Sequence, residues 1–363
     1  MNSVPAQALI SPAAAEFSQQ LVSSDGVMNI YLHAPGGAIE VSGGGLGSQT
    51  IQSVPMTRQD QVYIRSIVSR LDSIIDLDFA FVGEAAQADT AIYYDQEIVL
   101  GEGGSGQTLG LSVSGSAGWE LFVNYPLVAD NQDYRQYVNV HEWGHSLGLE
   151  HPFEADDGDT YHNNTDPWTS AFPEQTVMAY RSPESGDWPD FFTTSDLIAL
   201  IEIWGAEKKW LSSGSDIFTG NPYRDLISGL GGNDHLIGGN GDDRINGNAG
   251  SDWLQGSVGN DEIFGGSGND FLRGGVGNDW LIGDFGDDQI WGDLGADRIR
   301  LSTGNDQIWG FSALEGDRLE LDRGISFSLE SINEGTQIRT MLGVTTLVGV
   351  FDQGTVNSSI DLV

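Results

Sequence analysis

The sequence predicts an α+β domain followed by an all-β domain that is a parallel β-roll. The first prediction rests on an amphipathic helix, several strand-like segments and a histidine-bearing helix within the first 211 of 363 residues. The second rests on an aspartate that recurs every nine residues from Asp216 onward, among many glycines. A short period of this kind is typical of stacked repeats.

The chain is strongly acidic. It contains 53 Asp and Glu residues against 15 Lys and Arg residues, which gives a formal net charge of −38. This charge argues against nucleic acid or an anionic membrane as a partner and favours bound cations. An acidic segment rich in glycine is therefore expected to stay unfolded until cations such as Ca²⁺ neutralise it.

Cysteine is absent, which excludes disulfides and a cysteine-based zinc site. The first basic residue is Arg58, so the N-terminus lacks the charged region of a secretory signal peptide. No apolar run reaches the roughly 18 residues of a membrane-spanning helix, and we expect no membrane insertion.

Residues 1–25 are rich in Ala, Ser and Gln and are expected to form a mobile leader or a short propeptide. Ile30–Leu32 has strand character, and residues 36–47 are expected to form a glycine-rich turn region. Thr57 is expected to cap an amphipathic helix of about five turns that packs on a sheet. Its apolar residues recur at helical spacing: Ile64, Ile67, Val68, Leu71, Ile74 and Ile75.

Three further segments have strand character, at 77–82, 90–94 and 119–124. Two positions are open for the segment 119–124. It is either at the rim of a cleft, where it would pair with an extended peptide, or an ordinary internal strand. The next predicted element is a helix over 134–147.

Three histidines and a glutamate lie close together in and just after this helix. His141 and His145 are four residues apart and project from one helix face. Gly148 can take the left-handed conformation that ends a helix, which lets the chain turn back and bring His151 to the same point. Three neutral imidazoles suit Zn²⁺ and leave its charge to polarise a water molecule, and Glu142 is placed to take the proton.

Two elements complete this domain, whose bounds we place at 26–211. The apolar run Thr176–Tyr180 places Met178 at a distance downstream that fits a methionine turn beneath the ligands. A helix capped by Thr194 or Ser195 then ends at Gly205.

One unit of nine residues recurs through the C-terminal part without a register slip. Its aspartates are Asp216, Asp225, Asp234, Asp243, Asp252, Asp261, Asp270, Asp279, Asp288, Asp297 and Asp306. Two residues after each aspartate stands an apolar residue, as in the unit Gly265–Arg273. Glycines make the tight turn, and a three-residue strand carries one inward aliphatic, so that stacked strands share a continuous core.

Two units make one full coil, so aspartates eighteen residues apart lie on the same side and share ions with the carbonyls of the glycine loops. Oxygen ligands of this kind suit Ca²⁺. Calcium is expected at Asp234, Asp243, Asp252, Asp261, Asp270, Asp279, Asp288 and Asp297. The units at 220–225 and 301–304 lack the glycine pair, which weakens the expectation of calcium there. We place the roll at 212–312 and a cap of antiparallel strands at 313–363.

Together these features resemble the serralysin family, secreted bacterial zinc metalloproteases of the metzincin clan with RTX calcium-binding repeats. The pattern HExxHxxGxxH from His141 to His151, followed by Pro152, resembles its zinc motif. Met178 with Tyr180 resembles its Met-turn, and the nonapeptide array resembles its C-terminal domain. The resemblance covers nearly the whole chain, residues 26–363.

The resemblance implies a metzincin catalytic domain in which His141, His145 and His151 bind one zinc ion. Glu142 is then the general base, and Tyr180 is a fifth ligand that swings to stabilise the oxyanion. The alternative for Tyr180 is a buried packing residue.

The chain ends in two apolar residues after an acidic one, Asp361-Leu362-Val363. They are similar to the uncleaved signal that sends this family through a type I secretion exporter. The resemblance therefore implies that the protein is secreted and extracellular.

We therefore expect a monomeric, secreted zinc endopeptidase that hydrolyses protein or peptide substrates. One alternative is a calcium-dependent surface or adhesive protein whose protease-like domain is inactive. Another is that the roll serves only to drive folding after export, where calcium is abundant.

Overall fold

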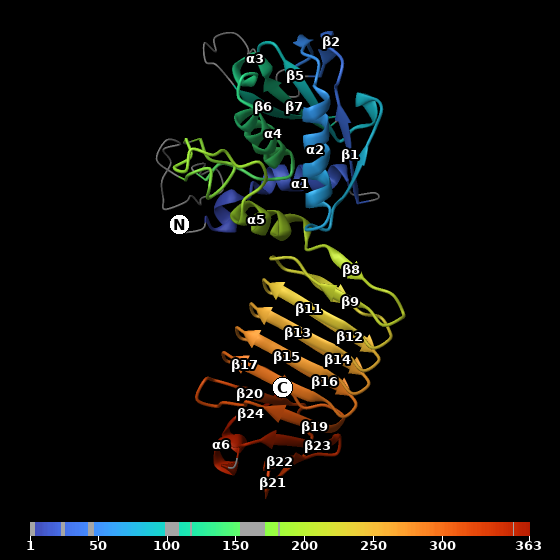
Figure 1. Cartoon of the computed structure of the whole chain (residues 1–363), viewed down its shortest axis with the longest axis vertical. Coiled ribbons are helices and arrows are strands. Elements are labelled where there is room, and N and C mark those ends of the chain that lie inside the picture. The colour runs from blue at the N-terminus through green and yellow to red at the C-terminus, as the bar shows by residue number, and fades with distance from the viewer. Residues whose placement is uncertain are drawn as a thin grey trace. The chain divides into compact units, whose positions relative to one another are not determined.

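The computed structural model describes residues 4–22, 26–42, 47–98, 109–116, 118–152, 171–180, 182–350 and 352–363. The chain divides into two compact units, 1–205 and 206–363 (Figure 1). The first unit combines helices with a mixed sheet, and the second is built from parallel strands. The predicted order, an α+β region followed by a parallel all-β region, is thereby confirmed.

A seven-stranded sheet forms the framework of the first unit, with strand order β2-β3-β5-β1-β4 and with β7 and β6 added beside β5. Its strands are β1 (Val27–Leu32), β2 (Gly37–Val41), β3 (Gln49–Ser53), β4 (Asp78–Phe81), β5 (Thr90–Asp95), β6 (Gly110–Gly115) and β7 (Gly118–Asn124). Every residue of β5 is buried, which places this strand in the core. The strand β2 occupies part of the region expected to be a turn, because its pairing with β3 overrides the glycine-rich local sequence.

The segment 119–124 lies inside the sheet. It forms β7, which pairs in parallel with β5 and antiparallel with β6. Within the described residues, β6 has β7 as its strand partner and therefore occupies the rim. The rim position that we considered for β7 is thus wrong. The sequence of β6, Gly-Leu-Ser-Val-Ser-Gly, carries too weak an apolar pattern to be predicted as a strand.

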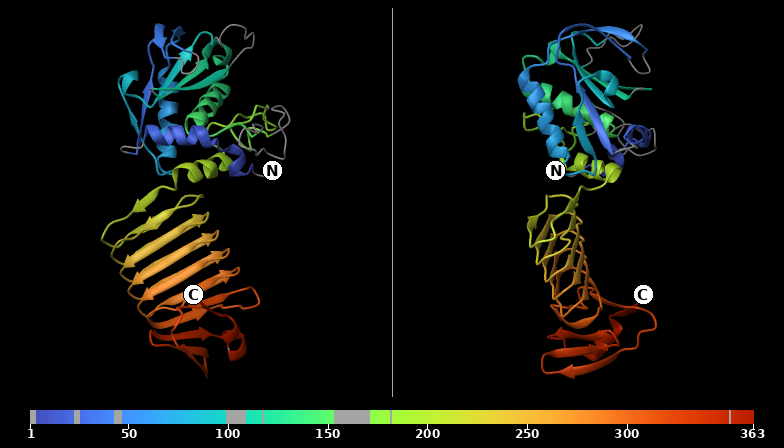
Figure 2. Two further views of the ribbon diagram at one scale, coloured as in Figure 1. Left: turned by 180° about the vertical axis from the view of Figure 1, so that it is seen from behind. Right: turned by 90° about the vertical axis from the view of Figure 1, so that its right-hand side faces the viewer.

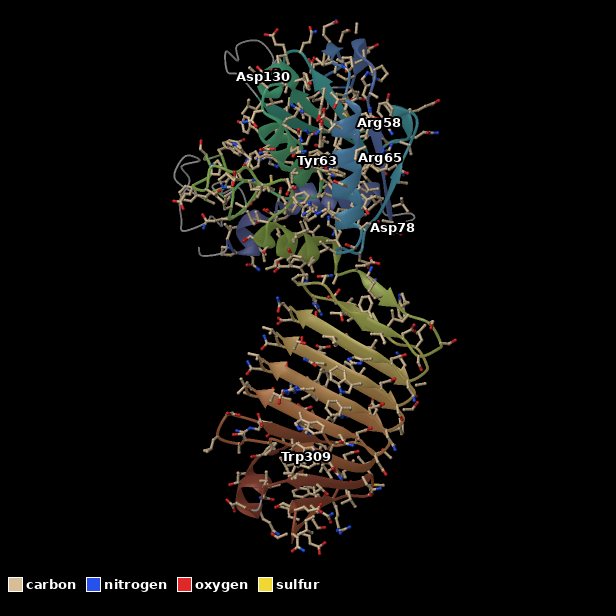
Figure 3. All side chains as sticks on the ribbon, in the orientation of Figure 1. Arg58, Tyr63, Arg65, Asp78, Asp130 and Trp309 are labelled. Carbon is tan, nitrogen blue, oxygen red and sulfur yellow. The ribbon has the colours of Figure 1, made fainter. Side chains whose placement is uncertain are left out.

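The helices of the first unit are η1 (Ala6–Leu9), α1 (Pro12–Leu21), α2 (Arg58–Leu71), η3 (Ala85–Gln87), α3 (Tyr125–Val128), α4 (Gln132–Ser146) and α5 (Thr194–Trp204). Three of them, α2, α4 and α5, correspond to predicted helices, and the other four were not predicted. The side chain of Thr57 caps α2 as predicted, whereas α5 is capped by Thr193, one residue before the predicted positions. The hydroxyl of Tyr63 on α2 lies 3.2 Å from the carbonyl oxygen of Gln136 on α4, which ties the two helices together (Figure 3).

Among the helices that the structure describes, none is long and apolar enough to cross a membrane.

The described part of the expected mobile leader is folded, so this expectation is wrong for residues 4–22. Leu9 is fully buried. The Ser18 hydroxyl on α1 donates to the carbonyl oxygen of Ser146 at 2.7 Å and accepts from Trp119 Nε1 at 2.9 Å. These contacts attach α1 to α4 and β7, and they join residues too far apart in sequence to be recognised from local composition.

The second unit is a roll of two parallel sheets whose strands alternate along the chain (Figures 1 and 2). One sheet contains β8 (Lys208–Trp210), β10 (Leu226–Ser228), β12 (Arg244–Ala249), β14 (Glu262–Ser267), β16 (Trp280–Phe285), β18 (Arg298–Arg300), β20 (Arg318–Leu321) and β24 (Ile360–Leu362). The other contains β9 (Ile217–Thr219), β11 (His235–Asn240), β13 (Trp253–Val258), β15 (Phe271–Val276), β17 (Gln289–Leu294), β19 (Gly304–Trp309), β21 (Ser328–Ile332), β22 (Gly335–Arg339) and β23 (Gly343–Val348).

The strand register confirms that two nonapeptides make one coil. Leu254 in β13 pairs with Leu236 in β11, eighteen residues earlier, and with Leu272 in β15, eighteen residues later. These three leucines are fully buried and continue into the apolar core of the unit. On the outer face of the same sheet, aromatic rings stack from one strand to the next, as Trp291 does on Trp309. Trp309 is labelled in Figure 3.

The segment after Phe311 closes the roll partly as predicted. The strands β21, β22 and β23 are antiparallel, but β23 also pairs in parallel with β19. The C-terminal strand β24 pairs in parallel with β20, so it extends the roll sheet. The helix α6 (Gln353–Ser358) precedes it.

Truncating one rung of the roll core is expected to destabilise it. Leu254→Ala removes a fully buried side chain, and such changes cost about 2–5 kcal/mol of unfolding free energy. Denaturant unfolding of the calcium-loaded protein, followed by amide exchange of residues 226–308, measures this loss. Val258→Ala on the same strand is the control, because Val258 is 48% exposed. Equal stability of the two variants would contradict the stacked core.

Candidate metal centre

The structure brings the three predicted histidines together at the C-terminal end of α4. One side-chain nitrogen from each of His141, His145 and His151 lies within 4.8 Å of the other two. The Nε2 atoms of His141 and His151 are 3.2 Å apart. Two nitrogens bound to a tetrahedral Zn²⁺ at about 2.0–2.1 Å lie about 3.3–3.4 Å apart. The arrangement therefore fits a zinc ion.

The turn after α4 brings the third histidine of the cluster into place. Gly148 has φ of +103°, as predicted for the residue that ends the helix. Its N–H donates to the carbonyl oxygen of His145, and the N–H of Leu149 donates to that of Gly144, which is the Schellman pattern of helix termination. The chain thereby reverses within three residues and returns His151 towards the helix.

Backbone carbonyls orient two of the imidazoles. The Nδ1 atom of His141 lies 2.7 Å from the carbonyl oxygen of Val177, and Nδ1 of His145 lies 3.0 Å from that of Leu149. A carbonyl can only accept, so each Nδ1 carries the proton and each Nε2 is left for a metal. Burial and the two neighbouring histidines lower the pKa of His141 well below its usual value, which keeps this ring neutral.

The methionine turn is held in place by a residue that the sequence analysis did not select. Asp196, at the start of α5, is fully buried and accepts hydrogen bonds from the Val177 N–H and the Thr176 hydroxyl. Val177 in turn presents its carbonyl to His141. Met178 lies against Gly144, where an added Cβ would be 2.7 Å from the methionine sulfur. The capping pattern Thr-x-x-Asp was the sequence signal for Asp196.

Glu142 is buried between α4 and the rim strand β6. The Ser112 hydroxyl lies 2.8 Å from Glu142 Oε2 and 2.7 Å from the main-chain oxygen of the same residue. Burial raises the pKa of Glu142 to about 8, against the lowering effect of the Ser112 hydrogen bond. A nearby divalent cation would favour the ionised carboxylate instead.

A cleft of about 440 Å³ opens beside His141 and Glu142. It is lined by Leu109, Gly110, Tyr134, Tyr137, Val138, His141, Glu142, Ala179, Tyr180, Ser182 and Trp188. Tyr180 is 44% exposed, so the alternative of a buried packing residue does not hold. Its ring centroid lies 4.6 Å from that of His151, which places the phenol next to the ligand cluster.

The repeated aspartates of the second unit form two ladders of buried carboxylates. In each, Oδ1 accepts a hydrogen bond from the backbone N–H of the aspartate eighteen residues earlier, as Asp270 does from Asp252. Oδ2 is buried and has no hydrogen-bond partner among the described residues in Asp234, Asp243, Asp252, Asp261, Asp270, Asp279, Asp288 and Asp297. These are the eight positions at which the sequence predicts calcium. Orphaned carboxylate oxygens of this kind are the ligands that Ca²⁺ prefers.

Glycine is needed beside these oxygens. An added Cβ at Gly265 would lie 2.5 Å from Asp270 Oδ2 and 2.7 Å from the carbonyl oxygen of Gly283. Oxygens from two consecutive coils therefore converge on space that any other side chain would fill. The donor set fits calcium.

The repeats of Asp225 and Asp306, whose sequences lack the glycine pair, differ from these eight in that Oδ2 of the aspartate has a hydrogen-bond partner. Asp225 Oδ2 accepts from the backbone N–H of Asn221, and Asp306 Oδ2 accepts from the Ser302 hydroxyl. Asp317, outside the nonapeptide register, continues one ladder by accepting from the backbone N–H of Asp297. The spacing of twenty residues hid Asp317 from the periodic pattern.

Comparisons with known proteins bear most directly on the repeats of the second unit. The family model described as RTX calcium-binding nonapeptide repeat (4 copies) matches residues 210–245, 237–272, 246–281 and 273–308. The second unit therefore carries RTX calcium-binding repeats.

A curated relative, Serralysin B of Dickeya chrysanthemi, is 28% identical over 135 residues. The match covers 34% of this chain and 28% of that protein. A solved structure, the AlgE6R3 subunit of the Azotobacter vinelandii mannuronan C5-epimerase, is 21% identical over 42% of this chain and 82% of that chain. Its TM-score of 0.23 is too low to support any structural argument.

Without calcium, the roll is expected to lose stability as the pH rises from about 4 to about 8. Burial raises the pKa of Asp243 to about 8 and that of Asp279 and Asp288 to about 7, against about 3.9 for an unfolded aspartate. The folded carboxylates thus hold protons more tightly than the unfolded ones, which stabilises the roll below about pH 4. This contribution disappears as the pH passes the raised values.

Amide-exchange protection factors of residues 226–308, measured in chelator on the whole protein, test this expectation. Protection should fall between pH 5 and pH 8 in chelator and should be high at pH 8 with saturating calcium, which binds ionised carboxylates. Equal protection at both pH values in chelator would argue against it.

Proposed function

We propose that this protein is a secreted zinc-dependent endopeptidase whose C-terminal roll is stabilised by calcium. The observation that carries the proposal is the cluster of three imidazoles next to the buried Glu142 carboxylate, with His141 and Glu142 lining one cleft. The partial similarity to Serralysin B supports it.

In this proposal His141, His145 and His151 hold the zinc ion through Nε2. When bound, the ion supplies positive charge that polarises a water molecule and the carbonyl of the peptide. The hydrogen bonds to the carbonyls of Val177 and Leu149 keep two of the rings in the ligating tautomer.

Glu142 acts as the general base and then as the general acid. Its carboxylate accepts a proton from the attacking water and later transfers that proton to the nitrogen of the leaving amine. Tyr180 is exposed beside His151. Its hydroxyl donates a hydrogen bond to the carbonyl oxygen of the peptide bond under attack as negative charge develops there.

The rim strand β6 offers a binding site for an extended substrate. Its outer edge can pair with a peptide through main-chain hydrogen bonds, which leaves the side chains to enter the cleft. This role, which we first considered for the segment 119–124, belongs in the proposal to β6, since β7 is covered on both edges.

The roll fits a protein that folds outside the cell. Its ladder aspartates need cations, and calcium is abundant outside the cell. Before the roll folds, the segment that becomes strand β24 is not yet paired with β20, so a type I exporter can bind it. We propose the first unit as the peptidase and the second as the calcium-dependent roll.

Replacing the proposed general base tests the proposed peptidase activity. Glu142→Gln should lower kcat/KM for a protein substrate such as casein about 10²–10⁴-fold, because a positioned general base contributes that much. Zinc content, measured by metal analysis, should stay near that of the wild type, since no ligand is removed. His145→Ala should lose both zinc and activity.

The same preparation decides between the proposal and a binding protein. Wild-type protein that carries zinc but cleaves no member of a peptide library would refute the peptidase. Attachment of that inactive protein to cells or polysaccharide in a calcium-dependent manner would identify an adhesive protein instead.

A further inference from the structure

The rim strand β6 contacts the catalytic glutamate through a side chain. Ser112 Oγ lies 2.7 Å from the main-chain oxygen of Glu142 and 2.8 Å from its Oε2. The main-chain oxygen belongs to α4 and is fixed by the helix. Ser112 therefore has one immobile contact that sets where its hydroxyl sits, and the second contact reaches the mobile carboxylate.

The opposite side of the carboxylate is bounded by Gly110, two residues earlier on the same face of β6. An added Cβ at Gly110 would lie 2.2 Å from Glu142 Oε1. The carboxylate thus occupies space that a larger residue at position 110 would take. Pairing of Gly110 with Val123 and of Ser112 with Leu121 fixes the register of β6 on β7.

Orientation of this carboxylate matters for the proposed reaction. A general base must lie within hydrogen-bond distance of the proton it takes, and displacements of about 1 Å can cost about 100-fold in rate. The Glu142 side chain has several rotatable bonds, and α4 fixes only its Cα. Contacts from β6 select among the remaining rotamers.

We propose that Ser112 is a positioning residue that holds the Glu142 carboxylate in its catalytic orientation. The inference rests on the proposed peptidase function. The Ser112 hydroxyl keeps its proton throughout and shares it between the main-chain oxygen and Oε2 of Glu142, while Oε1, beside Gly110, accepts the proton of the water and releases it to the leaving amine. The sequence of β6 thereby contributes to the rate as well as to substrate binding.

The test compares two matched variants of the full-length protein loaded with zinc and calcium. Ser112→Ala removes the hydroxyl at Glu142. Ser73→Ala makes the same change at an exposed position outside β6 and the cleft, where the hydroxyl also donates to a main-chain oxygen, that of Arg70. We expect Ser112→Ala to lower kcat about 10- to 100-fold, the effect of a small displacement of the base, with KM within about twofold of the wild type. Ser73→Ala should match the wild type.

Further measurements distinguish a positioning role from a structural one. Zinc content and thermal midpoint of Ser112→Ala should equal those of Ser73→Ala, and Ser112→Thr, which keeps the hydroxyl, should recover most of kcat. A peptide hydroxamate, whose acidic proton passes to the general base on binding, should bind Ser112→Ala about tenfold more weakly than it binds the wild type.

Each outcome is decisive. Equal kcat and equal hydroxamate affinity in the two alanine variants would overturn the positioning role. Loss of zinc or of thermal stability specific to Ser112→Ala would also overturn it, because the serine would then be structural. Wild-type protein without peptidase activity would sink the proposed function, while the hydroxamate comparison would still report on Ser112.

Discussion

The structure depends on burying ionisable groups whose charge the chain does not itself neutralise. Eight ladder aspartates keep one buried oxygen without a partner among the described residues. Burial raises the pKa of Asp243 to about 8 and that of Asp279 to about 7. An unpaired buried carboxylate is unfavourable, so the roll is stable with its carboxylates ionised only when a cation stands among them. Part of the acidity of the chain thus lies where metal ions can offset it.

The same constraint operates in the first unit on a smaller scale. Glu142 and His141 are both buried, and burial disfavours the charged form of each. A neutral imidazole is the form that ligates a metal, so burial of His141 favours binding. For Glu142, the positive charge of a bound ion would restore the carboxylate that general-base chemistry requires. One desolvated environment therefore suits both the proposed ligand and the proposed base.

Glycines decide where these buried groups can fit. Gly265 leaves room for the oxygens of Asp270 and Gly283, Gly144 leaves room for Met178, and Gly110 leaves room for the carboxylate of Glu142. In each case an added Cβ would lie less than 3.0 Å from a functional atom. The absence of a side chain at these positions makes room for the groups of both candidate sites.

The sequence by itself determined the features that depend on spacing along one chain segment. The four-residue spacing of His141 and His145, the left-handed Gly148 and the nonapeptide register follow from the periods of the helix and the roll coil. Only the tertiary structure decided that α1 packs on Ser146, that Asp196 holds Val177, and that Ser112 reaches Glu142. These contacts join separate elements through single polar side chains. No period in the sequence marks such pairs, because they arise from how the elements pack rather than from the elements themselves.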